Sequence, residues 1–319
     1  MKLKMLKKRT GKLNGMRLIR GDSFCMGSEE FYPEEEPVRV VSVGDFWMDE
    51  TPATNAQFAH FVDATGYVTF AERFLSPQDY AGYSPEMLVP GSSVFDPPQG
   101  LARLSFSADT VPAWWQFVPG ASWRHPLGPG SGIEAREDHP VVHVVAEDAE
   151  AYASWSGKSL LTEAEWEYAA RGGLDGAKFA WGDELEPDGR RLAKYWEGDF
   201  PNENRAPPGL ERTVPVRSYP ENGYGLYDMI GNVWEWTADW YSHARVDGSS
   251  CCGSVGREQD AMQKSVDRDA AIAVPRRVLK GGSHLCAASY CRRYRPAARW
   301  PQAIDTSTSH IGFRCIVRR

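Results

Sequence analysis

The sequence predicts a single α+β domain that is rich in loops and low in regular secondary structure. Between residues 75 and 140 the chain is dense in proline, glycine and serine, and few segments there are periodic. Such long irregular stretches normally argue against a compact domain. The chain also has 12 tryptophans, and large aromatic side chains can anchor loops by burying their surface. We therefore expect a compact domain despite the loops.

Three helices are predicted from start and stop signals. Thr54 and Gln57 form a capping box that opens the first helix. The third helix begins in the same way at Thr162, and each of the three is followed by a glycine, the usual residue after a helix end. These signals place helices over residues 54–66, 148–156 and 162–172.

Composition and charge are those of an ordinary enzyme. The chain has 319 residues, of which 42% are hydrophobic, enough for a sizeable core. Its net charge of -7 argues against a nucleic-acid partner, and no apolar run approaches the ~18 residues that span a membrane. Residues 1–15 form a basic arm without the apolar segment of a secretory signal. We therefore expect a cytoplasmic protein whose domain covers residues 16–319.

The most informative part of the sequence is a pair of cysteines, Cys286 and Cys291. The segment 276–299 around them has seven Lys or Arg and no acid, and positive charge favours the reactive thiolate over the thiol. On a helix the two side chains would diverge by about 140°, and on a strand they would point to opposite faces. Their sulfurs converge only if the chain turns, which Gly281 and Gly282 permit. A short-loop disulfide or two unrelated buried thiols stay open as alternatives.

The run GGSHLCAASYCRRYRPAAR at residues 281–299 is followed by TSHIGFRC at residues 308–315. Together they resemble the C-terminal signature of formylglycine-generating enzymes, the sulfatase-modifying factors that oxidise a sulfatase cysteine to formylglycine, in their prokaryotic type. Shorter matches, at residues 26–28, 138–141, 161–168 and 222–240, are shared with relatives of other function. The resemblance covers roughly residues 15–319 and implies a fold related to C-type lectins.

The resemblance implies a copper-dependent oxidase. Its substrate would be a Cys-x-Pro-x-Arg segment of a sulfatase polypeptide, with O₂ as the oxidant. Cys286 and Cys291 would bind Cu(I) together with the substrate cysteine, whose Cβ hydrogen is removed before hydrolysis to the aldehyde. Two thiolates suit Cu(I) or Zn²⁺, and only copper of these two is redox-active. A copper-free thiol mechanism with the same cysteines stays open.

The same resemblance assigns further site residues. Ser283 and Trp234 would shape the pocket for O₂, and Tyr290 would lie beside the metal. Arg299 would bind the extended substrate peptide.

The run DMIGNVWE resembles a family calcium loop. Asp228 and Glu235 would supply carboxylate oxygens, and Gly231 and Val233 would supply main-chain oxygens, the hard ligands that Ca²⁺ requires. At the family's other calcium site the first ligand aligns with Lys194, whose ammonium would replace or repel the ion. We therefore expect one Ca²⁺ in each chain.

The resemblance also implies that the disulfides of secretory-pathway members are missing. The four aligned positions hold Ala153, Ala170, Pro296 and Cys315. Cys315 is therefore predicted to be a lone buried thiol. The polar residues 242–275 resemble an insertion that carries Cys251 and Cys252, to which we assign no role.

Two other functions stay open. A non-catalytic C-type-lectin-like binding module would keep the tryptophan-rich scaffold without needing the cysteine pair. A non-haem iron sulfoxide synthase on the same scaffold would need a histidine cluster. His139 and His143 are four positions apart, but Pro140 and the valines that follow it predict a strand, on which the imidazoles would lie ~13 Å apart. The sequence therefore argues against a metal site there.

Overall fold

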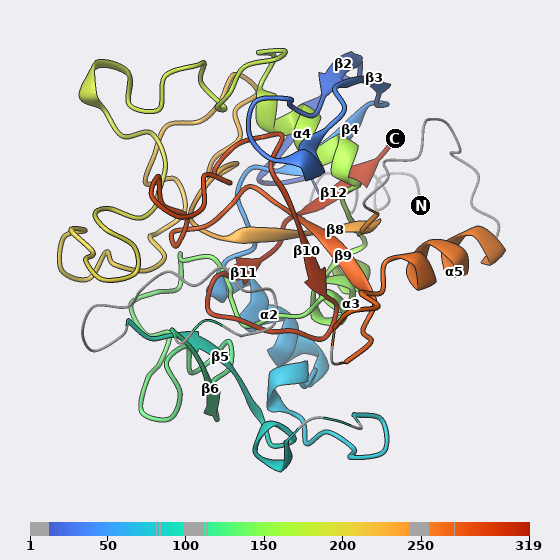
Figure 1. The fold of residues 1–319 in the computed structure, drawn as a ribbon, viewed down its shortest axis with the longest axis vertical. Helices are drawn as coiled ribbons and strands as arrows, with labels where there is room; N and C mark the ends of the chain where they lie inside the picture. The colour runs from blue at the N-terminus through green and yellow to red at the C-terminus, as the bar shows by residue number, and fades with distance from the viewer. Residues whose placement is uncertain are drawn as a thin grey trace, which may run out of the picture.

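Short strands and helices joined by long loops make up the fold of this computed structural model (Figure 1). It describes residues 13–80, 82, 84–97, 112, 114–242, 255–270 and 272–319. The strands are β1 (Met16–Ile19), β2 (Ser23–Met26), β3 (Arg39–Ser42), β4 (Phe46–Asp49), β5 (Gly91–Phe95), β6 (Trp115–Pro119), β7 (Ser159–Leu160), β8 (Trp234–Trp240), β9 (Arg276–Lys280), β10 (Arg299–Ala303), β11 (Ile311–Gly312) and β12 (Cys315–Arg318). The helices are α2 (Asn55–Thr65), α3 (Ala146–Ser156), α4 (Glu163–Arg171) and α5 (Val255–Lys264), with 3-10 turns η1 (Pro33–Glu35), η2 (Phe70–Glu72), η3 (Pro85–Met87) and η4 (Pro187–Gly189). The predicted loop-rich α+β class is confirmed.

Two four-stranded sheets organise the described chain. The first has the order β1-β4-β12-β7, so that β12 from the end of the chain lies between early strands and pairs antiparallel with β4 and β7. The second has the order β10-β9-β8-β11, in which β11 runs parallel to β8. Strands β2 and β3, and strands β5 and β6, form two separate pairs. The second sheet carries the connection from β9 to β10, which contains Cys286 and Cys291.

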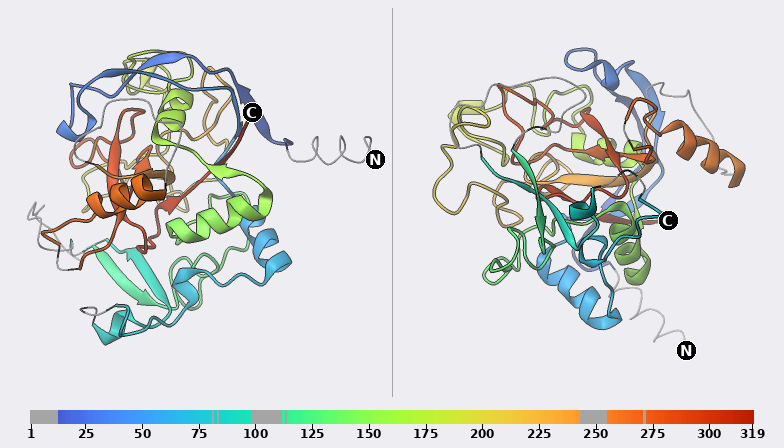
Figure 2. Two further views of the ribbon diagram at one scale, coloured as in Figure 1. Left: turned by 90° about the vertical axis from the view of Figure 1, so that its right-hand side faces the viewer. Right: turned by 60° about the horizontal axis from the view of Figure 1, so that its bottom comes forward.

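The three predicted helices are confirmed. In α2 the Oγ1 of Thr54 accepts a hydrogen bond from the backbone N–H of Gln57, as the capping box requires. Thr162 caps α4 in the same way, while α3 begins two residues earlier than predicted. Helix α5 lies in the polar segment that we had described only as an insertion, and it projects from the side of the molecule (Figure 1; Figure 2, right).

Tryptophans anchor the loops, as the composition predicted. The Nε1 of Trp236 donates to the carbonyl of Val144 at 2.9 Å, and the Nε1 of Trp196 donates to the carbonyl of Glu203 at 2.9 Å. Both indole rings are buried. The loops of residues 172–233, drawn in yellow-green to yellow at the left of Figure 1, contain no strand. Buried indoles with satisfied N–H groups hold such segments in place of sheet ladders.

The strand predicted over the valines after Pro140 is wrong. The backbone N–H of Val141 donates to Ala53, whereas that of His143 donates to Thr308, so the segment has no common ladder partner. His143 has a left-handed φ of 61°, which breaks an extended conformation. Its ring nitrogens contact a serine hydroxyl and a backbone carbonyl. Within the described residues no cluster of three or more His, Cys, Asp or Glu side chains is placed to hold a metal ion.

The structure leaves some predictions untouched. The basic arm of residues 1–15 is described only from residue 13, and Cys251 and Cys252 lie outside the described residues. None of the helices in the described part of the chain combines the length and the apolar composition needed to cross a lipid bilayer.

Replacing Arg314 with Met should destabilise the fold strongly. Arg314 is fully buried, and its guanidinium pairs with the buried carboxylate of Glu235 at 2.8 Å. Loss of the partner leaves an uncompensated buried charge, so we expect the free energy of unfolding to fall by about 3–5 kcal/mol. The matched control is Arg318→Met, because the Arg318 side chain is 44% exposed where it pairs with Glu165. That control should cost no more than about 1 kcal/mol in chemical denaturation, and equal losses in the two variants would contradict the role of burial.

Candidate active site

The cysteine loop begins at the end of β9, where the chain turns sharply. Lys280 is fully buried, and its Nζ donates to Glu167 Oε2 at 2.9 Å. Gly281 and Gly282 follow with φ of 93° and 70°, a region that favours glycine. A Cβ on Gly282 would lie 2.6 Å from the carbonyl oxygen of Arg293, so a side chain there would force the loop apart. The turn predicted from the two glycines is confirmed.

The turn brings the two sulfurs together. Cys286 Sγ and Cys291 Sγ lie 3.2 Å apart, and neither cysteine is in a disulfide. Tight turns shape the loop: the N–H of Cys286 donates to the Ser283 carbonyl at 3.0 Å, and that of Cys291 donates to the Ala287 carbonyl at 2.9 Å. In this structure the two cysteines are therefore neither a disulfide nor unrelated thiols. They form one two-sulfur site.

The surroundings of the two sulfurs shift their pKa values in opposite directions. Burial raises the pKa of Cys286 well above its ordinary value, so its proton is retained. The hydrogen bond from Cys286 and the positive charge of Arg293 lower the pKa of Cys291 to about 6. Loss of a proton from the pair is therefore favoured at Cys291, the partly exposed residue of the two.

Arg293 is the site residue that sequence reasoning missed. Its Nη1 lies 3.8 Å from Cys291 Sγ, and its Nη2 pairs with Glu34 Oε1 at 2.5 Å. Its guanidinium carbon lies 3.9 Å from the centroid of the Tyr32 ring. The charge count of the segment pointed to a basic environment, but it could not tell which arginine faces the sulfur. The 259 positions between Glu34 and Arg293 hide the contact from any local pattern.

Two of the residues predicted to surround the metal, Ser283 and Tyr290, lie in the cysteine loop itself. Ser283 is fully buried at the turn that positions Cys286. The Tyr290 ring stacks on Phe200, with ring centroids 4.6 Å apart, and meets Trp114 edge-on at 5.7 Å. Both cysteines raise the pKa of Tyr290 in addition to burial, which places its hydroxyl in their neighbourhood.

Trp234 is buried next to the segment that contacts the cysteine loop. It begins β8 and belongs to the same buried cluster as Cys286. Just before it, the carbonyl of Asn232 accepts hydrogen bonds from the N–H and the Nδ1 of His284. The segment that leads into β8 is therefore bonded directly to the cysteine loop. Its predicted role beside O₂ stays a prediction.

Arg299 is buried in an ion pair. Its Nε lies 2.9 Å from Glu163 Oε1, and its Nη1 donates to the carbonyl of Ser242 at 3.0 Å. The guanidinium carbon also lies 4.7 Å from the centroid of the Tyr241 ring. Because these contacts are inside the protein, they argue against direct contact with a substrate peptide. Its predicted role in binding the substrate stays a prediction.

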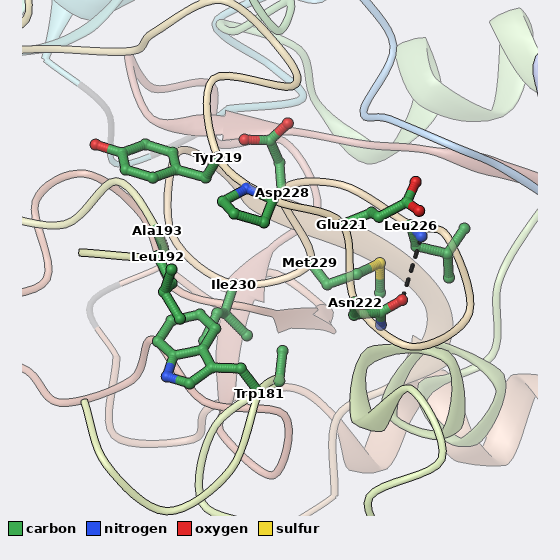
Figure 3. A pocket seen from close by; sticks show the side chains of 12 residues that line it. Trp181, Leu192, Ala193, Tyr219, Glu221, Asn222, Leu226, Asp228, Met229 and Ile230 are labelled. Atoms are coloured by element: carbon green, nitrogen blue, oxygen red, sulfur yellow. Dashed lines mark hydrogen bonds between the residues drawn. The ribbon is translucent and has the colours of Figure 1, made fainter. Parts of the chain in front are cut away.

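The predicted calcium loop lies next to the cysteine loop. The N–H of Gly231 donates to the carbonyl of Gly281 at 2.9 Å. Asp228 lines a pocket with Tyr219 and Asn222 (Figure 3), and burial raises its pKa to about 6. A buried carboxylate that is hard to ionise alone is stabilised when a cation binds it.

Glu235 fits a calcium ion only in part. Its carboxylate accepts from the Nε and Nη2 of Arg314 and from the Nε1 of Trp166. A carboxylate offers about four lone-pair positions, so a calcium ion would have to share Glu235 with both residues. Asp228, Gly231 and Val233 remain as the other candidate ligands.

Lys194 is also packed against this loop. Its side chain is 2% exposed, and its Nζ lies 3.8 Å from Glu197 Oε1. Its carbonyl accepts a hydrogen bond from the N–H of Asn232 at 2.8 Å. The ammonium is therefore held inside the protein, and its predicted effect on a second calcium site stays a prediction.

Comparison with known proteins shows the family of the chain. The sulfatase-modifying factor enzyme 1-like domain matches residues 2–319. The chain is 51% identical over 301 residues to the formylglycine-generating enzyme of Mycobacterium tuberculosis (strain ATCC 25618 / H37Rv), covering 93% of this chain and 96% of that protein. It is 45% identical over 310 residues to the formylglycine-generating enzyme of Thermomonospora curvata, covering 94% and 92%.

The fold is also found in a solved structure. PvdO from Pseudomonas aeruginosa has a TM-score of 0.56 to this chain and 24% sequence identity, covering 94% of this chain and 93% of that one, a likeness that concerns the fold. Fold and cysteine pair together define an oxidoreductase of the sulfatase-modifying class. The chain belongs to the formylglycine-generating enzyme family, and the resemblance seen in its sequence is confirmed.

Alkylation of Cys291 by iodoacetamide should follow its lowered pKa. The thiolate forms as pH rises through about 6, so labelling should increase between about pH 5 and pH 7 and then level off. Cys25 is an internal control, because Asp175 raises its pKa and labelling there should begin only in the alkaline range. Peptide mapping by mass spectrometry distinguishes the two sites. Parallel pH profiles for Cys25 and Cys291 would contradict the assigned charges.

Proposed function

We propose that this chain converts the cysteine of a sulfatase Cys-x-Pro-x-Arg segment to Cα-formylglycine, with O₂ as the oxidant and Cu(I) as the cofactor. The observation that carries the proposal is the pair of free sulfurs 3.2 Å apart in one loop. The chain belongs to a family in which similar proteins are named formylglycine-generating enzymes, and this membership supports the same activity.

The chemistry requires more than side chains. Conversion of –CH₂SH to –CHO removes two hydrogens from the substrate, takes its oxygen from water and releases sulfide, while O₂ accepts the two electrons and protons. Cu(I) bound by Cys286 and Cys291 would supply the one-electron centre that reaction with O₂ needs. The donor set fits, because two converging soft sulfurs select Cu(I) among redox-active metals.

The chain's own residues prepare this site. The loop fixes both sulfurs before the substrate arrives, so little ordering is left for binding. Burial of Cys286 and Ser283 excludes water on one side. The partly exposed Cys291 leaves the other side open to an incoming thiol. The Tyr290 ring near the two cysteines is held in place by its contacts with Phe200 and Trp114.

A reducing compartment, the cytoplasm, fits the thiols. Cys315 is fully buried and free, as predicted, and Cys25 is free as well. Among the described residues the fold therefore holds together without a cross-link, as proteins of reducing compartments do.

Serine at either site cysteine should abolish turnover. We expect Cys286→Ser and Cys291→Ser to lose both aldehyde formation on a Cys-x-Pro-x-Arg peptide and Cu(I) binding, because one sulfur cannot form the two-sulfur site. Cys25→Ser is the control and should keep both. Mass spectrometry of the peptide measures the aldehyde, and a chromogenic chelator measures the metal.

Four results would count against this proposal. A single mutant of the pair with near-normal turnover would exclude the two-sulfur site. Wild-type turnover without copper would favour the copper-free thiol mechanism, and an equal rate without O₂ would exclude an oxidase. If no such peptide reacts after copper loading, the alternative function of a non-catalytic binding module is favoured over the oxidase.

We also propose one structural Ca²⁺, bound by Asp228, the carbonyl oxygens of Gly231 and Val233, and the remaining acceptor position of Glu235. Oxygen ligands from one loop are typical of Ca²⁺. Calorimetry should find one equivalent in the wild type and none in Asp228→Asn, which removes the anionic ligand. Asp188→Asn, an exposed control, should bind normally. Two equivalents would refute the loss of the other site at Lys194.

A further inference from the structure

The guanidinium of Arg293 connects the sulfur pair to the acidic loop of residues 27–38, which joins β2 to β3 near the opposite end of the sequence. Its Nη1 lies 3.8 Å from Cys291 Sγ, and its Nη2 and Nε contact Glu34 Oε1 at 2.5 and 3.2 Å. Its carbon lies 3.9 Å from the ring centroid of Tyr32 and 4.5 Å from that of Trp300. Hydrogen bonds set the direction of the cation, and ring contacts limit its movement.

We propose that Arg293 is a positioning residue whose fixed positive charge offsets the negative charge that the sulfur pair carries when it holds Cu(I), and thereby sets the affinity of the pair for Cu(I). The inference rests on the proposed function, since it takes Cys286 and Cys291 as the copper ligands. Two thiolates and one Cu(I) leave one net negative charge in a largely buried site. Such a charge is costly unless a partner offsets it, and Arg293 is placed to do so.

Position, not the number of arginines, makes this role specific. Arg292 is the immediate neighbour, but its side chain is exposed and its Nε donates to the carbonyl of Ala288 at 3.1 Å. Arg293, by contrast, is paired with Glu34, which keeps its side chain from turning to solvent as that of Arg292 does. The loop that carries Glu34 is itself fixed, because Glu35 forms a buried ion pair with Arg295. The cation is therefore part of a rigid frame around the sulfurs.

Anaerobic competition with a chromogenic Cu(I) chelator tests the proposal on the full chain. Arg293→Gln should bind Cu(I) about 10- to 100-fold more weakly, the loss expected for one buried charge-assisted contact. Arg293→Lys keeps the charge without the planar bridge and should lie in between. Glu34→Ala should weaken binding by a smaller factor than Arg293→Gln. Arg292→Gln removes the same charge one position away and should stay within about twofold of the wild type.

Several outcomes would overturn the proposal. Equal Cu(I) affinity of Arg293→Gln and wild type would do so, as would an equal loss in Arg292→Gln, since net charge and not position would then matter. A wild type that binds no Cu(I) would overturn the proposed copper site and this inference together, a result distinct from the first two. Melting curves on the same samples show whether Arg293→Gln is folded, and Arg293→Lys carries the comparison if it is not.

Discussion

One buried carboxylate, that of Glu167, places both halves of the candidate active site. Its Oε2 accepts from Lys280, the last residue of β9 before the cysteine loop. Its Oε1 accepts from the N–H of Gly27 at 2.7 Å, close to the start of the acidic loop, and from Arg171 at 2.8 Å. A carboxylate at zero exposure is tolerated only when its acceptor positions are used in this way. The distance between the two loops is therefore set by the scaffold rather than by the loops themselves.

The asymmetry of the sulfur pair follows from this arrangement. Cys286 faces the buried aromatic core, where a charge is costly and the proton stays. Cys291 comes at the end of the loop, beside Arg293 and nearer to solvent. One loop thus places two identical side chains in opposite environments. The protein needs no further titratable group to keep one of them reactive at neutral pH.

Local signals made part of this structure predictable. Capping residues such as Thr54 and Thr162 act within one turn of chain, so their helices could be placed from sequence, and so could the turn at Gly281 and Gly282. The prediction of a strand after Pro140 failed because the run of buried valines is typical of a strand in a sheet. Their backbone hydrogen-bond partners lie in separate segments instead. Residue chemistry alone left the role of the cysteine pair open, and the family resemblance was needed. No local pattern could reveal Arg293, because its partner is 259 residues away.

The position of β12 has a consequence for synthesis of the chain. This strand follows all the other described strands along the chain, yet it fills the gap between β4 and β7. The first sheet therefore cannot close while residues 315–318 are still in the ribosome, and the contacts between the acidic loop and the arginines wait almost as long. Pairing of such distant segments is slow and leaves edges open meanwhile. The thiols of a nascent chain would thus be exposed before the surrounding structure forms. The redox state of the compartment in which the chain is synthesised is therefore a condition for its correct folding.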